Sequence, residues 1–191
     1  HYENTQLDKV EAAADMIIES IKNGGMVYLC GIGHSNEADF LNRAGGLAIV
    51  QAFNYSLNTN ANVPNCKKDR ERPEPFNQEL ETARFALKAS NVRAGDIMVM
   101  GSVSGKTSHT VSLAIACQEM GVKVIGFTSL EYTAKVESLH PSGKKLVDVS
   151  DLVIDNGAPY GDAAVKIPGM DYDMLPVSGV SMVVSGWLIW G

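Results

Sequence analysis

The stretch 96–107, DIMVMGSVSGKT, constrains the fold more than any other part of the chain. Residues 97–100 form a short apolar run without a helical period, which is typical of a strand buried in the middle of a parallel sheet. From Thr107 onward the apolar residues recur with helical spacing until Gly121, and glycine commonly ends helices. The stretch therefore predicts a central strand that leads through a short loop into a helix.

That loop predicts an anion site, because it carries the hydroxyls of Ser102, Ser104 and Thr107 together with Gly105. The first N–H groups of a helix lack partners and carry a partial positive charge, so phosphate binds there and nearby hydroxyls add donors. Gly-Lys-Thr also ends a P-loop, but Gly101 and Gly105 enclose one residue fewer than a P-loop requires. The alternative, an ordinary turn whose Ser and Thr side chains cap the helix, fits the pattern equally well.

Strands alternate with helices along most of the chain. Because successive parallel strands are joined by right-handed crossovers, this alternation predicts an α/β fold with a three-layer, doubly wound, five-stranded parallel sheet. We expect a single domain over residues 1–191, continuing beyond both ends of the given sequence, since the last helix has no stop signal. The expected strands are 26–30, 48–53, 97–100, 122–128 and 151–155, and the expected helices are 7–21, one between 35 and 45, 76–90, 107–120 and 177–190.

A polar segment, 54–75, interrupts this alternation with several asparagines and three prolines. We expect a long loop here. Loops of this length inside a domain often form binding lids or partner contacts, and the alternative is a solvated excursion.

Composition narrows the classes of partner. The net charge is -6 and no basic block stands out, which argues against nucleic acid and anionic membranes as partners. The three cysteines have no paired spacing, and no leader is visible in the given sequence, so we expect a cytoplasmic protein without disulfides. The four histidines have no metal-ligand spacing, and we expect neither a metal nor a cofactor.

The apolar segment 177–190 covers most faces of its expected helix. It is shorter than the roughly 20 residues that span a bilayer, so we expect no membrane insertion. A helix that is apolar nearly all round predicts burial at or near a subunit interface, and hence a homo-oligomer.

Together these stretches resemble the sugar isomerase (SIS) domain family. The resemblance rests on GIGHS at 31–35 with RAGGL at 43–47, SVSGKT at 102–107, HPSGKKL at 140–146 and VIDNGAPYGDA at 153–163. It is strongest to a branch of stand-alone SIS proteins without an assigned activity, related to phosphoheptose isomerase and N-acetylmuramic acid 6-phosphate etherase.

The resemblance implies a flavodoxin-like sheet and a homo-oligomer whose sites lie near subunit boundaries. It also implies that a sugar phosphate is the ligand, held by Ser35, Ser102, Ser104, Gly105 and Thr107. The expected activity is aldose–ketose isomerisation. The alternatives are an etherase-type lyase acting on an amino-sugar phosphate and a non-catalytic phosphosugar sensor.

Isomerisation needs a base that moves a proton between adjacent carbons, and carboxylate and imidazole are the usual groups. The candidates are Glu37, His34 and His140. For Glu37 the alternative is a solvated helix residue, for His34 a local capping role, and for His140 a surface turn. His109 is a weaker candidate for supporting the anion, with an exposed helical position as its alternative.

Overall fold

A computed structural model of the chain describes residues 1–31, 36–41, 43–71 and 76–191. Its centre is a five-stranded sheet in the order β2–β1–β3–β4–β5, with every neighbouring pair parallel. The order reverses between β1 and β3, as in flavodoxin-like folds, and this confirms the predicted fold class. The strands are β1 Val27–Cys30, β2 Val50–Ala52, β3 Ile97–Gly101, β4 Lys123–Thr128 and β5 Leu152–Asp155.

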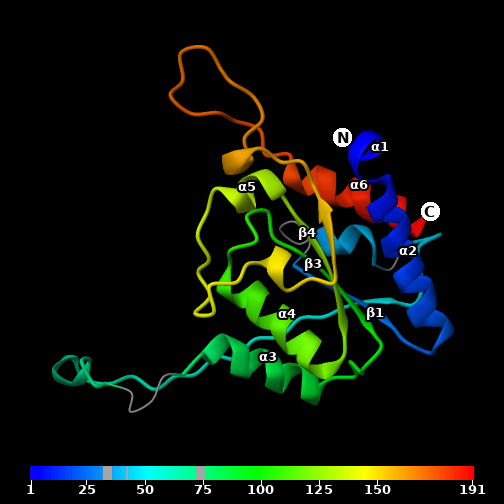
Figure 1. Cartoon of the computed structure of the whole chain (residues 1–191). Coiled ribbons are helices and arrows are strands. Elements are labelled where there is room, and N and C mark those ends of the chain that lie inside the picture. The colour runs from blue at the N-terminus through cyan, green and yellow to red at the C-terminus, as the bar shows by residue number, and fades with distance from the viewer. Residues whose placement is uncertain (32–35, 42, 72–75) are drawn as a thin grey trace.

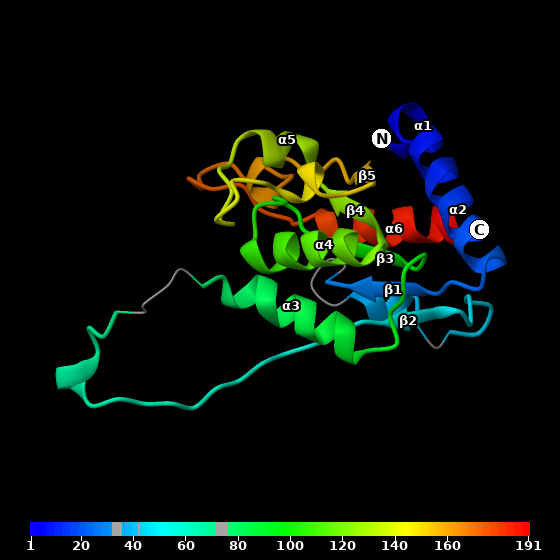
Figure 2. The same ribbon diagram turned by 60° about the horizontal axis from the view of Figure 1, so that its bottom comes forward.

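Helices cover both faces of the sheet (Figure 1, Figure 2). α2 (Leu7–Lys22) and α6 (Ser178–Trp190) pack on one face, and α3 (Gln78–Ala89) and α4 (Ser108–Met120) pack on the other. Two short helices, α1 (Tyr2–Thr5) and α5 (Leu130–Ala134), complete the set. None of the helices in the described ranges is both long enough and apolar enough to cross a membrane.

The strands alternate between these two cores. Val27 and Leu29 belong to the core under α2 and α6, whereas Tyr28 belongs to the core under α3 and α4. Both faces of each central strand are therefore buried, which explains why residues 97–100 are a continuous apolar run rather than an alternation.

The helix expected between residues 35 and 45 is not formed by the described residues of this stretch. Between residues 35 and 45 the described residues form only a 3₁₀ turn, Asn36–Asp39. Phe40 follows this turn and is 2% exposed, with its ring 5.6 Å from that of Trp187 and 6.1 Å from that of Trp190. Packing of this ring against the two tryptophans of α6 accompanies the 3₁₀ path of the chain here, where the sequence had led us to expect a helix.

Two segments leave the body of the molecule. The described residues of the segment 54–75 form the expected long loop: the chain is extended after Phe53, and the helical element among these described residues is the 3₁₀ turn Asn65–Lys67 (Figure 2). A second excursion, residues 163–176, was not expected and is closed by an antiparallel bridge between Val165 and Met174 (Figure 1).

Candidate functional site

The loop 102–107 leaves β3 at the carboxyl edge of the sheet, beside the point where the strand order reverses. It borders a cavity of about 420 Å³, which we call the seat cavity. Ser102, Ser104 and Thr107 line this cavity from the loop, and Thr110 lines it from the first turn of α4. Tyr132 from α5 and Asp162 from the 3₁₀ turn Tyr160–Asp162 complete its polar wall.

The carbonyls of this loop are held mostly by hydrogen bonds from residues outside it. Each carbonyl from residue 102 to residue 107 accepts a hydrogen bond, so the loop cannot turn its carbonyls toward the cavity without losing them. Among the described residues, by contrast, the N–H groups of Ser104, Lys106 and Thr107 donate to no acceptor. The carbonyl partners are Gly105 N for residue 102, Ser129 N and Thr128 Oγ1 for 103, Thr133 Oγ1 for 104, Leu146 N for 105, Leu139 N for 106 and Val111 N for 107.

The hydroxyls of the loop do not act as helix caps. Thr107 is the N-cap residue of α4, yet its side chain makes no capping hydrogen bond. In α3 and α5, by comparison, Asn77 accepts from Leu80 N at 3.2 Å and Ser129 accepts from Tyr132 N at 3.0 Å. The structure therefore leaves the start of α4 uncapped by its own side chain, and its donors available to an anion.

Gly105 is needed for the shape of this loop. Its φ of 64° lies in the left-handed region that side chains rarely adopt. A Cβ at this position would lie 3.1 Å from the hydroxyl oxygens of Thr128 and Thr133, the residues that anchor the neighbouring carbonyls. Any other residue here would adopt a strained backbone and would push on the hydroxyls of Thr128 and Thr133.

A second cavity of about 370 Å³ adjoins the first and shares Gly31 and Thr110 with it. We call it the Glu37 cavity, because Glu37 lines it from the 3₁₀ turn after β1. His109 lines it from α4, and Tyr55 lines it from the segment after β2. The imidazole of His109 stacks on the Tyr55 ring, with centroids 5.0 Å apart and planes 25° apart.

Burial raises the pKa of two further groups that line the Glu37 cavity, Cys30 and Tyr55. It raises the pKa of the Cys30 thiol to about 11, with a smaller contribution from the nearby Glu37 carboxylate. Burial also raises the pKa of Tyr55 well above that of an exposed tyrosine. Both groups stay protonated near neutral pH, so Cys30 is not an activated nucleophile.

The structure brings together some of the residues predicted from sequence. Ser102, Ser104 and Thr107 line one cavity, and Glu37 lines the adjoining one. His34 and Ser35 lie outside the described residues.

His140 lies elsewhere. It is 6% exposed, with Nε2 3.1 Å from the Asn77 amide nitrogen and Nδ1 2.7 Å from Ser142 Oγ. It lines neither cavity, and its burial lowers its pKa. The sequence offers two interpretations of His140, a place in the site or a surface turn, and the structure shows a buried turn.

Sequence reasoning did not single out Tyr55, Thr110 or Asp162. Thr110 follows Thr107 by three residues and so lies on the same helical face, a signal that was available. Tyr55 lies in the polar segment 54–75, where no periodic pattern pointed to it.

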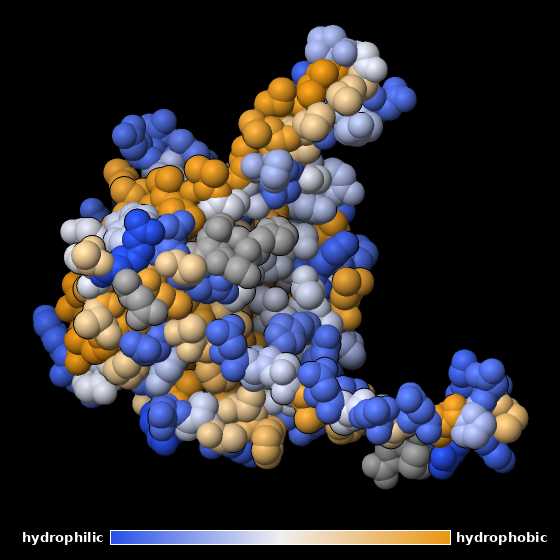
Figure 3. Space-filling view, turned by 180° about the vertical axis from the view of Figure 1, so that it is seen from behind, coloured by the Kyte–Doolittle hydropathy of each residue, from blue (hydrophilic) through white to orange (hydrophobic). Residues whose placement is uncertain are grey.

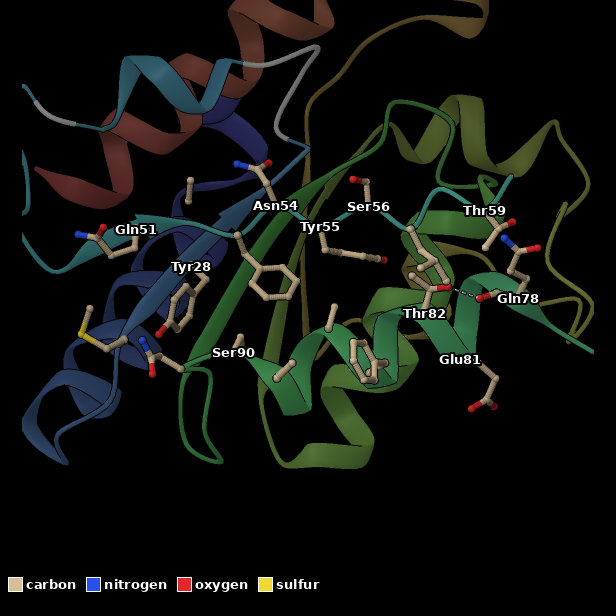
Figure 4. Close-up of a pocket in the computed structure, with 18 of the residues that line it drawn as sticks. Tyr28, Gln51, Asn54, Tyr55, Ser56, Thr59, Gln78, Glu81, Thr82 and Ser90 are labelled. Atoms are coloured by element: carbon tan, nitrogen blue, oxygen red, sulfur yellow. Dashed lines mark hydrogen bonds between the residues drawn. The ribbon is translucent and has the colours of Figure 1, made fainter. Parts of the chain in front are cut away.

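A larger cavity lies apart from the seat cavity. It has a volume of about 1150 Å³ and lies between β2, the segment that follows β2 and α3 (Figure 4). Apolar rings, including those of Phe53, Phe76 and Phe85, contribute much of its wall, and no residue of the loop 102–107 reaches it. Tyr55 borders both this cavity and the Glu37 cavity. Its size alone gives no reason to prefer it for an anion, because the helix start that borders it, at Gln78 of α3, is already capped by the Asn77 side chain.

Among the described residues, no group of three or more His, Cys, Asp or Glu side chains is placed to hold a metal ion.

The chain is similar to proteins of one sequence family. A family model described as SIS domain matches residues 1–129. A UPF0309 protein of Shouchella clausii is 36% identical over 171 residues, which cover 88% of this chain and 67% of that protein. A UPF0309 protein of Listeria innocua is 34% identical over 186 residues, which cover 95% of this chain and 72% of that protein.

Two solved structures share the fold. The phosphoheptose isomerase of Neisseria gonorrhoeae superposes with a TM-score of 0.58 at 16% identity, over 98% of this chain and 87% of that one. A phosphoheptose isomerase from Francisella tularensis superposes with a TM-score of 0.55 at 14% identity, over 98% and 86%. At these identities the similarity extends to the fold alone.

Proposed function

We propose that this chain, which belongs to the SIS domain family, binds a sugar phosphate with its phosphate group on the loop 102–107. The observation that carries this proposal is the division of the loop's polar groups. Its carbonyls all accept hydrogen bonds, one from Gly105 within the loop and the others from residues 111, 128, 129, 133, 139 and 146, while its hydroxyls and several N–H groups have no partner among the described residues. The loop therefore presents unpaired donors while its carbonyls are engaged, which suits an anion, and the Asp162 carboxylate in the cavity wall accepts hydrogen bonds from Val177 and Ser178.

The adjoining cavities fit the two parts of such a ligand. A phosphate in the seat cavity would lie beside the hydroxyls of the loop and the positive end of the α4 dipole. The Glu37 cavity, reached past Gly31 and Thr110, then takes the sugar. Their combined size lies within the range of small-molecule sites.

The finer part of the proposal is aldose–ketose isomerisation, with Glu37 as the base. Its carboxylate lines the cavity that receives the carbon chain, and a carboxylate can take a proton from the carbon beside a carbonyl. His34 and Ser35 remain proposals from the sequence: Ser35 as a further phosphate ligand and His34 as a further acid–base group.

A thermal-shift panel tests the binding. Hexose, amino-sugar and heptose phosphates are compared with the same sugars without phosphate and with inorganic phosphate. A ligand that binds only the native state raises the melting temperature, so the sugar phosphates should stabilise more than the free sugars. Equal shifts, or none, would refute the proposal. Exchange of a sugar proton for solvent deuterium without isomerisation would favour the lyase alternative, and binding without exchange would favour the sensor.

We also propose that the protein self-associates through the outer face of α6. Val180, Val184 and Leu188 form a stripe along this helix at four-residue spacing and are 70%, 43% and 44% exposed. The excursion 163–176 adds further exposed apolar residues, including Met174 and Leu175. Figure 3 shows apolar surface on the arm that leaves the body of the molecule at the top of the view. Apolar surface of this extent typically marks an interface. Analytical ultracentrifugation at micromolar concentration tests this, and a monomer would contradict it.

A further inference from the structure

We propose that His109 is a second proton-transfer group of this site and that the ring of Tyr55 positions it. The inference rests on the proposed function, because it concerns the same cavity and the same ligand.

The first turn of α4 places side chains in both cavities. Thr107 and Thr110 face the seat cavity, whereas His109 and Thr110 face the Glu37 cavity. One helical turn therefore borders both cavities, with Thr110 at their boundary. A ligand whose phosphate lies against the start of this turn must extend its carbon chain past Thr110, into the space that His109 and Glu37 line.

The Glu37 cavity contains two groups that can transfer a proton. Among the described residues, the titratable side chains that line the Glu37 cavity are Cys30, Glu37, Tyr55 and His109. Because burial keeps Cys30 and Tyr55 protonated near neutral pH, the remaining candidates are Glu37 and His109. They come from different elements, the turn after β1 and the start of α4, so neither depends on the other for its placement.

His109 is exposed, but a row of aromatic rings holds its imidazole in place. His109 stacks on Tyr55, and Tyr55 in turn lies 5.5 Å from the ring of Phe53, which is buried against Tyr28. This chain of rings connects the imidazole to the core beside β1. Figure 4 shows Tyr55 reaching inward from the segment that follows β2. The Tyr55 hydroxyl is buried and has no hydrogen-bond partner within the described ranges, so its ring, and not its hydroxyl, does the positioning.

The proton balance of the reaction assigns each group one task. Glu37 takes the proton from the carbon beside the carbonyl, and protonated His109 gives a proton to the carbonyl oxygen, so that an enediol forms. Glu37 then returns its proton to the former carbonyl carbon, while neutral His109 takes the proton of the neighbouring hydroxyl as the new carbonyl forms. Both residues end in their starting states, and no other reactant is consumed.

The experiment compares three variants, His109→Gln, Tyr55→Phe and Tyr55→Leu, with Gln118→Ala, an exposed residue near the other end of α4, as the matched control. The substrate is the sugar phosphate that gives the largest thermal shift, and inorganic phosphate serves as the probe of the seat. We expect His109→Gln to lower kcat by about 100-fold or more, the usual effect of losing a general acid, while its Kd for inorganic phosphate stays within about threefold.

Tyr55→Phe keeps the ring and should retain at least about ten times the kcat of Tyr55→Leu, with unfolding curves confirming that both variants are folded. Equal kcat values in these two variants, or a His109→Gln variant within about threefold of the wild type, would overturn the inference and leave sugar-phosphate binding intact. A wild-type protein that binds sugar phosphates without turnover would also overturn it. A wild-type protein that binds none would overturn the proposed function itself.

Discussion

Ser104→Ala and Thr107→Ala should weaken phosphate binding while leaving the fold nearly as stable as before. Neither hydroxyl has a hydrogen-bond partner in the described part of the chain, so removing it breaks no internal contact. In the complex each hydroxyl would donate to an anionic oxygen, and a hydrogen bond to a charged group contributes about 1.5–3 kcal/mol. Each substitution should therefore raise Kd by roughly 10- to 150-fold.

Calorimetric titration with inorganic phosphate and with the best sugar phosphate measures this effect, beside urea unfolding curves of the same variants. Thr107→Ser keeps the hydroxyl and should keep most of the affinity. Asn77→Ala provides the opposite control: it removes a formed cap from α3, so it should lower stability by about 1 kcal/mol and leave affinity unchanged. If Ser104→Ala and Thr107→Ala behaved as Asn77→Ala does, the reasoning from the loop would be refuted.

Three further variants test other parts of the fold. Gly105→Ala should lower stability by about 1–3 kcal/mol and weaken phosphate binding, because the left-handed backbone and two nearby hydroxyls exclude a Cβ; an unchanged urea midpoint would contradict this. Gly186→Ala should lower the melting temperature because the new methyl group would collide with the ring of Phe40, and adding Phe40→Leu should recover part of the loss. His140 should make stability depend on pH. Burial lowers its pKa in the folded state below the ordinary value of about 6.5, so the unfolded state binds more protons. The free energy of unfolding should therefore fall as the pH drops below about 6.5. His140→Gln should show a shallower fall between about pH 7 and pH 5 in urea unfolding, and an identical slope would exclude this histidine as the cause.

Most of the fold could be predicted because its signals are local. The apolar run at 97–100 is continuous because both of its faces are buried, and the helix starting near Thr107 ends at Gly121, which is left-handed in the structure as a terminating glycine should be. The missing helix after residue 35 shows where local signals stop. A helix was expected there, but Phe40 is buried against Trp187 and Trp190, which come about 150 residues later in the chain.

In the candidate site, too, the local features could be predicted from the sequence and the long-range contacts could not. The hydroxyls of the loop 102–107 lie next to each other in sequence, so their pattern could be recognised without a structure. The pairing of His109 with Tyr55 joins two segments that no sequence period relates, and the burial of His140 depends on Asn77 at the start of α3. Contacts of this kind follow from tertiary packing, and a single sequence holds no direct signal for them.

The anchors of the loop 102–107 also determine when it can take its shape during synthesis. Three of its carbonyls are held by Thr128, Thr133 and Leu146, which leave the ribosome roughly 25–40 residues after the loop itself. A nascent chain that ends before Leu146 would contain every hydroxyl of the motif and still lack the supports that orient its backbone. The segment SVSGKT is therefore not a portable binding element: moved into another protein without its distant anchors, it would be a flexible turn.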